Sequence, residues 1–233
     1  MIESRQNKQV KKWVKLKQKK YRDRYQLFLV YGSHLIEKAK QKKALIDIIT
    51  DHPEKEGILV SPEIMKDLQQ TVTYIDEIGL CRYTNEPIKS HAILALDHVQ
   101  DPDNVGALIR SAVAFGFRHI VLSPGSADQY NEKVIRASKG AIFDCYIERK
   151  PLEEALLAYK QAGYYIVGAD AHQSGSIVKK ENVVVVLGNE GHGISEQIKP
   201  IIDQFVTIQT QTVESLNVSV AGAIIMRDWS LLS

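Results

Sequence analysis

The sequence predicts an α/β protein whose larger, C-terminal part is built on a mostly parallel β-sheet and is preceded by a smaller α/β unit. Short apolar segments typical of strands alternate with segments of helical periodicity along the chain. One of them, 183–187, is four valines and a leucine, a composition typical of a strand covered on both faces. A polar, proline-containing segment at 82–91 separates two series of such elements. We therefore expect a first domain over 1–80, a linker over 81–90 and a second domain over 91–233.

In the first domain, an apolar strand segment is followed by Gly32, and Ser33 or His34 can cap the helix that comes next. The remaining elements are predicted from the alternation of apolar and polar residues. They are a strand at 27–30, a helix to about residue 43, a strand at 44–49, a helix at 62–69 and a strand at 71–74. This order predicts a small α/β domain.

In the second domain, strand and helix patterns alternate more regularly. The expected strands are 92–96, 119–122, 164–168, 183–187 and 205–208. The expected helices begin after a capping turn at 101–104 and, further on, cover 132–138, 152–161 and 216–231. Because strands alternate with helices, these elements predict a doubly wound, mostly parallel sheet.

Length and composition restrict the class of protein. The chain has 233 residues, 44% of them hydrophobic, which suits one or two globular domains. Its apolar segments are far shorter than the ~20 residues that span a bilayer, and the N-terminus lacks the hydrophobic core of a secretory signal. Cys81 and Cys145 lie far apart and outside any metal-binding motif. We expect free thiols, no metal site and a cytoplasmic protein.

Positive charge is concentrated at the N-terminus, where residues 1–24 hold ten lysines and arginines against two acidic residues. Apolar residues recur there at roughly helical spacing, at Val10, Trp13, Val14 and Tyr21. This predicts an amphipathic helix whose cations face solvent, either as a contact for a nucleic-acid backbone or as a merely solvated face. A membrane-surface helix would need a bulkier apolar face. The cations expected to contact nucleic acid are Arg5, Lys8, Lys11, Lys15, Lys19 and Arg22.

Ligands of doubly wound sheets bind outside the carboxyl ends of the strands. Three segments follow expected strands in this position, at 97–110, 188–195 and 209–219. The second contains three glycines, which would let the backbone approach a ligand closely. Its spacing matches neither the dinucleotide-binding fingerprint nor a P-loop, and a purely structural loop is the alternative.

The other two segments carry polar candidates. Arg110 shares a helix face with small residues, and it is either a functional charge or the ion-pair partner of Asp101 or Asp103. Ser215 and Asn217 are good helix-capping residues, which is the structural alternative for both. The small side chains that follow them suggest that a backbone or a ligand packs closely there.

Three motifs in these segments together carry a family resemblance. They are Asn104-Val105-Gly106-Ala107-Leu108-Ile109-Arg110-Ser111-Ala112, Leu187-Gly188-Asn189-Glu190-Gly191-His192-Gly193-Ile194-Ser195 and Ser215-Leu216-Asn217-Val218-Ser219-Val220-Ala221. In order and relative position they closely resemble the three motifs of TrmH-type RNA ribose 2′-O-methyltransferases of the SPOUT class. The resemblance covers about residues 91–233, and the N-terminal part resembles the small RNA-binding domain that precedes many family members.

The resemblance implies a parallel α/β domain with a C-terminal trefoil knot, S-adenosylmethionine as cofactor, and a homodimer that completes each active site across its interface. It implies that Arg110 acts on the ribose 2′-hydroxyl, either by accepting its proton together with an RNA phosphate or by stabilising the developing alkoxide. The implied catalytic residues are Asn104, Arg110, Glu190, Ser215 and Asn217. The implied cofactor-binding residues are Leu187, Gly188, Glu190, Gly193, Ile208, Leu216, Asn217 and Ser219.

Ribosomal RNA is the preferred substrate, because an RNA-binding domain is expected at the N-terminus. A transfer RNA ribose methyltransferase is the first alternative. An RNA-binding or ribosome-assembly protein that retains the fold without catalysis is the second, and the intact motif residues argue against it.

Overall fold

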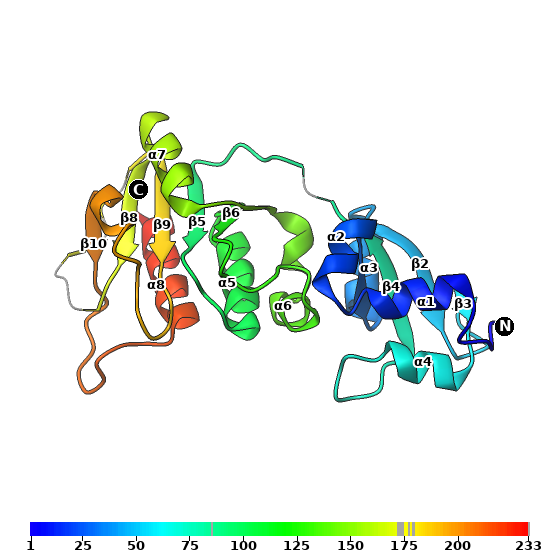
Figure 1. Cartoon of the computed structure of the whole chain (residues 1–233). Helices are drawn as coiled ribbons and strands as arrows, with labels where there is room; N and C mark the ends of the chain where they lie inside the picture. Colours follow the sequence, from blue (N-terminus) through cyan, green and yellow to red (C-terminus); the bar gives the residue numbers. More distant parts are fainter. Residues whose placement is uncertain (85, 172–174, 177, 179, 233) are drawn as a thin grey trace.

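The computed structural model describes residues 1–232 apart from 85, 172–174, 177 and 179. It contains two β-sheets in two lobes, which are joined by the segment between β4 (Glu77–Arg82) and β5 (Ala92–Leu96) (Figure 1). In the described part of the chain, no helix combines the length and the apolar composition needed to cross a membrane.

The N-terminal lobe is a four-stranded sheet with helices on both faces. Its strand order is β1-β4-β2-β3, in which β4 is antiparallel to both neighbours and β3 is parallel to β2. The further elements are α1 (Lys8–Lys15), α2 (Lys19–Tyr25), β1 (Leu27–Tyr31), α3 (Ser33–Gln41), β2 (Leu45–Thr50), β3 (Ile58–Leu59) and α4 (Pro62–Leu68). Trp13 of α1 and Met65 of α4 are buried on one face of the sheet, and Ile36 of α3 is buried on the other.

Two expectations for this lobe are wrong. Residues 71–74 form no strand, because the Gln69 side chain holds this segment as a loop: its Nε2 donates to the carbonyl oxygen of Ile75 at 2.7 Å and its Oε1 accepts the Ile75 N–H at 3.1 Å. The strand lies further along, as β4. The residue that caps α3 is Gly32, at φ +89°, and neither of the two residues that follow it makes the cap.

The basic N-terminal segment forms two helices instead of the single amphipathic helix that the spacing predicted. α1 and α2 are separated by a turn. Arg22 of α2 reaches back to this turn, where its Nη1 donates to the carbonyl oxygens of Leu16 and Lys17, both at 2.9 Å. These bonds satisfy carbonyl groups that would otherwise be unpaired at the end of α1. Trp13 is buried as expected, whereas Tyr21 lies on α2 and outside the core.

The C-terminal lobe is a six-stranded sheet in the order β10-β8-β9-β5-β6-β7, with every pair parallel. The prediction of a mostly parallel α/β fold is therefore confirmed. The further elements are α5 (Pro102–Ala114), β6 (His119–Leu122), α6 (Glu132–Ser138), η1 (Ala141–Asp144), β7 (Tyr146–Arg149), α7 (Leu152–Gln161), β8 (Tyr165–Ala169), β9 (Val183–Leu187), η2 (Lys199–Ile201), β10 (Gln204–Val206) and α8 (Val218–Leu231).

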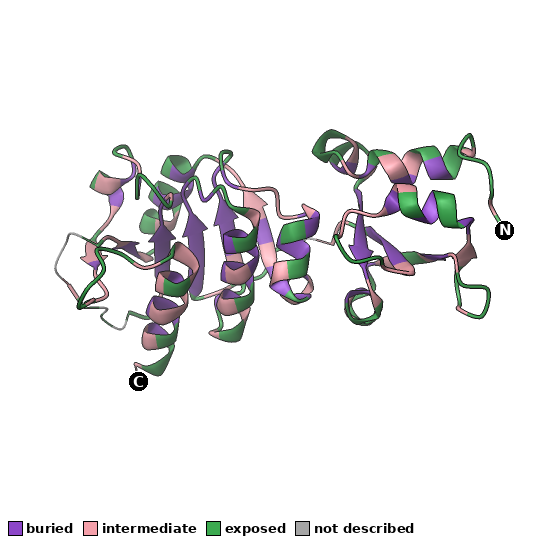
Figure 2. Cartoon of the chain, turned by 90° about the horizontal axis from the view of Figure 1, so that it is seen from below, coloured by how far each residue is buried: buried purple, intermediate pink, exposed green. Residues whose placement is uncertain are grey.

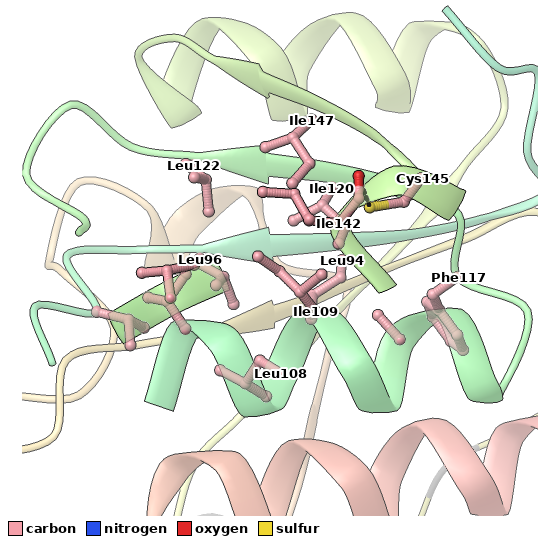
Figure 3. Packing of buried hydrophobic residues seen from close by; sticks show 14 of the residues in the cluster. Leu94, Leu96, Leu108, Ile109, Phe117, Ile120, Leu122, Ile142, Cys145 and Ile147 are labelled. Atoms are coloured by element: carbon pink, nitrogen blue, oxygen red, sulfur yellow. Dashed lines mark hydrogen bonds between the residues drawn. The ribbon is translucent and has the colours of Figure 1, made fainter. Parts of the chain in front are cut away.

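Alternate residues of the central strands supply the cores on the two faces of this sheet. Leu94 and Leu96 of β5 lie on the side of the sheet toward Ile109 of α5, whereas Leu108 points from α5 toward α8 (Figure 3). Ile93 belongs to the cluster on the other face of the sheet, with residues of α7. The strands are buried between the flanking helices (Figure 2). β7 was not predicted, because it is an edge strand whose charged residues interrupt the apolar pattern.

The two lobes share one apolar cluster. Phe28 of β1 and Tyr83 both pack against Tyr130, with ring centroids 4.6 and 3.8 Å apart respectively. Beside them, Arg22 Nη2 lies 2.5 Å from Asp128 Oδ2, and the two side chains are only 6% and 12% exposed. These contacts join α2 and β1 to the segment that precedes α6.

Candidate active site

Three loops that are distant in the sequence meet at the carboxyl edge of the parallel sheet. Asp97, which follows β5 and is buried, accepts hydrogen bonds from the Ser195 N–H at 2.8 Å and the Ser195 hydroxyl at 2.7 Å. In the same place, Asn189 Nδ2 donates to the carbonyl oxygen of His98 at 2.9 Å. The loop after β5 and the glycine-containing loop after β9 are therefore tied together by side chains of both.

Glycines give the loop after β9 its shape. The backbones of Asn189 and Gly193 exchange two hydrogen bonds of 2.9 Å, and Gly193 has φ +68°, a conformation that glycine adopts readily. A Cβ on Gly188 would lie 2.1 Å from the Gly193 carbonyl carbon and 2.3 Å from the Ile194 nitrogen. No side chain fits there, so the tight backbone approach depends on glycine.

A chain of hydrogen bonds connects this loop to α5 and α8. Asn217 Nδ2 donates to Asn104 Oδ1 at 3.0 Å, and Asn104 Nδ2 donates in turn to Glu190 Oε1 at 3.0 Å. Asn217 is also the N-cap of α8, since its Oδ1 accepts the Ser219 N–H at 2.8 Å. The capping interpretation of Asn217 is thus correct, but its amide has a second role in holding Asn104.

The loops enclose a cavity of about 580 Å³, within the usual range for small-molecule sites. All but one of the expected cofactor-binding residues line it: Leu187, Gly188, Glu190, Gly193, Ile208, Leu216 and Asn217. The exception is Ser219, whose hydroxyl donates to Asn217 Oδ1 at 2.6 Å. Ser215, expected in the catalytic set, also lines the cavity.

The lining fits the chemistry of S-adenosylmethionine. Apolar side chains such as Leu187, Ile208 and Ile225 offer a surface for an adenine ring. Carboxylates of Asp170, Glu190 and Glu214 border the same cavity, and they suit the positive charges of a sulfonium and an amino group. The glycine loop adds backbone donors and acceptors that no side chain covers.

Arg110 does not join this group within one chain. It is exposed on α5, it is not among the residues that line the cavity, and it has no hydrogen-bond or ion-pair partner among the residues that the structure describes. The alternative of a structural ion pair is wrong: Asp103 pairs with Arg136 at 3.8 Å, and the Asp101 side chain caps α5. Arg110 is therefore a cation held at the surface of a buried helix, without a partner from its own fold.

The N-terminal cations separate into three kinds. Lys8, Lys11 and Lys15 are exposed along one side of α1, as expected for a nucleic-acid contact. Arg5 and Lys19 are exposed but paired with carboxylates, those of Asp67 and Asp23. Arg22 corrects the expectation, because it is buried in the contact between the lobes and cannot reach RNA.

Sequence reasoning did not single out several residues of this site. Asp97 ties two loops together, and its position directly after a buried strand was the only available signal. Asp170 occupies the same position after β8, and Glu214 lies just before the third motif. No shared motif connects these acids in the sequence, so their common cavity became visible only in the fold.

The cavity shaped by glycines lies at the carboxyl edge of a parallel sheet, where doubly wound α/β proteins bind small molecules, and this defines the class of the C-terminal domain. The profile of the SpoU rRNA Methylase family matches residues 91–227, and that of the MRM3-like substrate binding domain matches residues 7–77. The 23S rRNA (guanosine(2553)-2′-O)-methyltransferase RlmP of Bacillus subtilis (strain 168) is 32% identical to this chain over 97% of each sequence. The chain therefore belongs to the SpoU rRNA methylase family.

Solved structures agree with this assignment. An rRNA methyltransferase from Sinorhizobium meliloti is 26% identical, with a TM-score of 0.85 over 100% of this chain and 98% of the other. An RNA 2′-O ribose methyltransferase is 27% identical, with a TM-score of 0.81 over 98% and 97%. An AdoMet-bound rRNA methyltransferase from S. meliloti, 24% identical over 100% and 98%, shares the fold with a TM-score of 0.84. The resemblance seen in the three motifs, and the methyltransferase class that it implies, are confirmed.

Proposed function

We propose that this protein transfers the methyl group of S-adenosylmethionine to a ribose 2′-hydroxyl of ribosomal RNA. The observation that carries the proposal is the convergence of all three motifs through the bonds between Asn217, Asn104 and Glu190 beside the glycine-shaped cavity. Family membership supports the reaction and the cofactor. The B. subtilis relative, named for 2′-O-methylation of 23S rRNA and matched over nearly its whole length, supports the substrate.

S-adenosylmethionine, when bound, supplies a methyl group on a sulfonium that leaves as a thioether. The protein must bring the ribose oxygen into line with that methyl group, and such positioning can supply much of the barrier reduction. The hydroxyl must also lose its proton as the new C–O bond forms. A guanidinium stays protonated in proteins, so we assign Arg110 the role of orienting an RNA phosphate and stabilising the developing alkoxide. The proton of the hydroxyl would pass to an oxygen of that phosphate and from there to solvent water. Asn104, Glu190, Ser215 and Asn217 would shape the site and hold the cofactor and the nucleotide.

We further propose that the enzyme is a homodimer in which Arg110 serves the cavity of the partner chain. Arg110 lies away from the cavity of its own chain and is exposed without a partner among the described residues. On α8, which packs beside α5, Val220 is 48% and Leu231 63% exposed. Both side chains belong to α8, and a dimer formed over α8 and α5 would cover them and bring the cation of one chain toward the other chain.

The trefoil knot remains a proposal that the strand order supports. β9 is inserted between β8 and β5, and the chain then crosses to β10 on the far side of β8 before it returns as α8 against α5. The cavity is lined by the loops after β8, β9 and β10 together. A segment that passes between such loops would produce the knot.

We keep the division into an RNA-binding domain expected over 1–80, a linker over 81–90 and a methyltransferase domain over 91–233, with one change: β4 (Glu77–Arg82) extends the first domain to residue 82, so the linker begins after it. The profile matches at 7–77 and 91–227 support this division. An rRNA substrate also suits the cytoplasmic location inferred from the cysteines, both of which are free and buried.

A transfer assay with labelled S-adenosylmethionine tests the proposal. Wild-type protein is incubated with total rRNA or with total tRNA, and labelled ribose 2′-O-methyl nucleosides are measured after digestion. We expect label in rRNA, a large loss with Arg110→Ala, and little change with Arg118→Ala, a matched exposed arginine just beyond the C-terminal end of α5. Label in tRNA alone would favour the tRNA alternative, and tight RNA binding without transfer would favour a non-catalytic protein.

A further inference from the structure

Two tyrosines lie side by side on α2 in the most basic part of the molecule. Tyr21 and Tyr25 are one helical turn apart, their ring centroids are 6.2 Å apart, and their planes differ by only 15°. Both side chains are partly exposed, and Tyr21 is not part of any buried apolar cluster of the described residues. Tyr25 also packs against the apolar cluster of this lobe, so core packing accounts in part for Tyr25 but not for Tyr21 or for the stacking of the two rings.

Four cations lie over the two rings. Lys15 and Lys20 are 5.4 and 4.9 Å from the centroid of the Tyr21 ring. Lys12 and Arg24 are 5.0 and 5.8 Å from the centroid of the Tyr25 ring. Cations within about 6 Å of an aromatic face are attracted by the ring quadrupole. The tyrosine pair thus gathers side chains from both α1 and α2 into one cluster.

The basic side chains of this region differ in whether they contact a carboxylate or a neutral aromatic ring, and this determines whether their charge is neutralised. Lys19 and Arg5, which lie nearby in the sequence, are each paired with a carboxylate that cancels their charge locally. Lys12, Lys15, Lys20 and Arg24 have no acidic partner within 4 Å among the described residues, and the rings that hold them are neutral. These four side chains are consequently restrained in position while their full positive charge stays available to an anion.

We infer that Tyr21 and Tyr25 organise Lys12, Lys15, Lys20 and Arg24 into a binding site for the phosphodiester backbone of an RNA strand. This inference rests on the proposed function, which makes RNA the natural polyanion for this lobe. Restraining four long side chains before binding lowers the entropy that must be lost when they contact phosphates. The site lies on α1 and α2, in the lobe that does not contain the methyl-transfer cavity.

The test measures binding of the full chain to a fluorescent RNA hairpin as a function of salt. Each phosphate contact contributes about 0.7 to 0.9 to the slope of log affinity against log salt. We expect the quadruple variant Lys12→Gln, Lys15→Gln, Lys20→Gln and Arg24→Gln to lower this slope by about 3. A control variant, which loses four exposed lysines elsewhere, should lower it by less than about 1. The control replaces Lys40, Lys43, Lys66 and Lys133 by Gln.

A second pair of variants tests the tyrosines themselves. Replacing both tyrosines by Leu leaves every charge in place, so the salt slope should stay the same while the affinity falls about fivefold through loss of the cation–π restraint. Replacing both by Phe keeps the aromatic faces and should preserve the affinity. The charge variants should retain the wild-type midpoint of thermal unfolding, because none of their side chains is buried. Tyr25 packs against the apolar cluster of the lobe, so the affinities of the Leu and Phe pairs are compared with wild type at a temperature at which circular dichroism shows all three proteins folded.

Equal slopes for the quadruple variant and its control would overturn the site, and wild-type affinity of the Leu pair would overturn the role of the tyrosines. Both results are separable from failure of the proposed function. If wild-type protein methylates rRNA but the quadruple variant binds RNA normally, this site is refuted and the function stands. If the slopes change as expected but no RNA is methylated, the function fails and the site stands.

Discussion

Replacement of Asn104 by Asp tests the polar chain at the site, because it changes one group at constant shape. Asn104 is only 9% exposed, and its Nδ2 donates to Glu190 Oε1 at 3.0 Å. In Asn104→Asp, two carboxylate oxygens would face each other at about that distance. Two unit charges 3.0 Å apart repel by roughly 5 kcal/mol at an effective dielectric constant of about 20, and by about 1.4 kcal/mol in water. Since Glu190 is exposed, water screens part of this repulsion, and we expect the variant to lose about 2 kcal/mol of unfolding free energy at pH 8 relative to wild type.

The loss should depend on pH in a definite direction. The repulsion raises the pKa of the carboxyl pair in the folded state above its unfolded value of about 4. Stability is therefore retained below that value and lost as the pH rises through the raised pKa, with a slope of up to about 1.4 kcal/mol per pH unit for one proton. At low pH, the protonated carboxyl of the variant can donate to Glu190 in place of the lost amide, while its other oxygen still accepts from Asn217.

Urea unfolding of wild type and variant from about pH 4 to about 8 measures this effect, because a loss of about 2 kcal/mol corresponds to a pKa raised by about 1.5 units and so develops mostly between about pH 4 and 6. Asn7→Asp provides the control, because Asn7 caps α1 through its Oδ1 and faces no carboxylate in the described structure. We expect this control to show no loss at any pH. A free-energy difference between wild type and Asn104→Asp that does not change with pH would refute the contact between Asn104 and Glu190.

Three further predictions concern packing, burial and the contact between the lobes. Gly106→Ala should lower the free energy of unfolding by about 2 to 3 kcal/mol in urea, because the added Cβ would lie 2.5 Å from Ala137 Cβ where α5 crosses α6; a stability equal to wild type would contradict this packing. Burial raises the pKa of Glu132, so ionisation of this carboxyl in the folded protein costs stability as the pH rises. We expect Glu132→Gln to raise the midpoint of urea unfolding at pH 8, with a gain that shrinks toward about pH 4. A lower midpoint at pH 8 would contradict this expectation. Arg22→Ala should lower the free energy of unfolding by about 3 kcal/mol, because it leaves the largely shielded Asp128 carboxylate unpaired. Arg22→Lys should not restore this stability, because one ammonium group cannot contact Asp128 and the carbonyl oxygens of Leu16 and Lys17 as the guanidinium does. Full restoration by lysine would contradict this explanation.

The sequence predicted the elements whose apolar pattern matches their burial. Val183–Leu187 and Ala92–Leu96 lie at the centre of the sheet, are buried on both faces, and were predicted with their observed bounds. β7 carries charged residues at the edge of the sheet, and residues 71–74 resemble a strand although Gln69 holds them in a loop. The pattern of apolar residues in the sequence indicates which strands are buried. It does not indicate the backbone conformation where a side-chain hydrogen bond, such as that of Gln69, determines it.

The site could be located from the sequence, but its contacts could not. Each motif follows a strand, which placed Asn104, Glu190 and Asn217 at one edge of the sheet. Their hydrogen bonds span 86 and 113 positions, and no spacing rule specifies such pairs. Arg22 was one of ten cations in the first 24 residues, and only the fold shows that its partner Asp128 is 106 positions away and mostly shielded from solvent.

The hydrogen bonds that link Glu190, Asn104 and Asn217 have a fixed order of donors and acceptors, and Glu190 sets this order. A carboxylate only accepts hydrogen bonds, so the nearer group of Asn104 must be its Nδ2, which leaves Oδ1 to accept from Asn217. With its Nδ2 committed to Asn104, Asn217 presents Oδ1 to the Ser219 N–H and so begins α8. One negative charge in the loop after β9 thereby fixes the orientation of two amides and the start of the last helix. A cofactor that contacts Glu190 would act on this same chain, which couples the cavity to α5, the helix that carries Arg110.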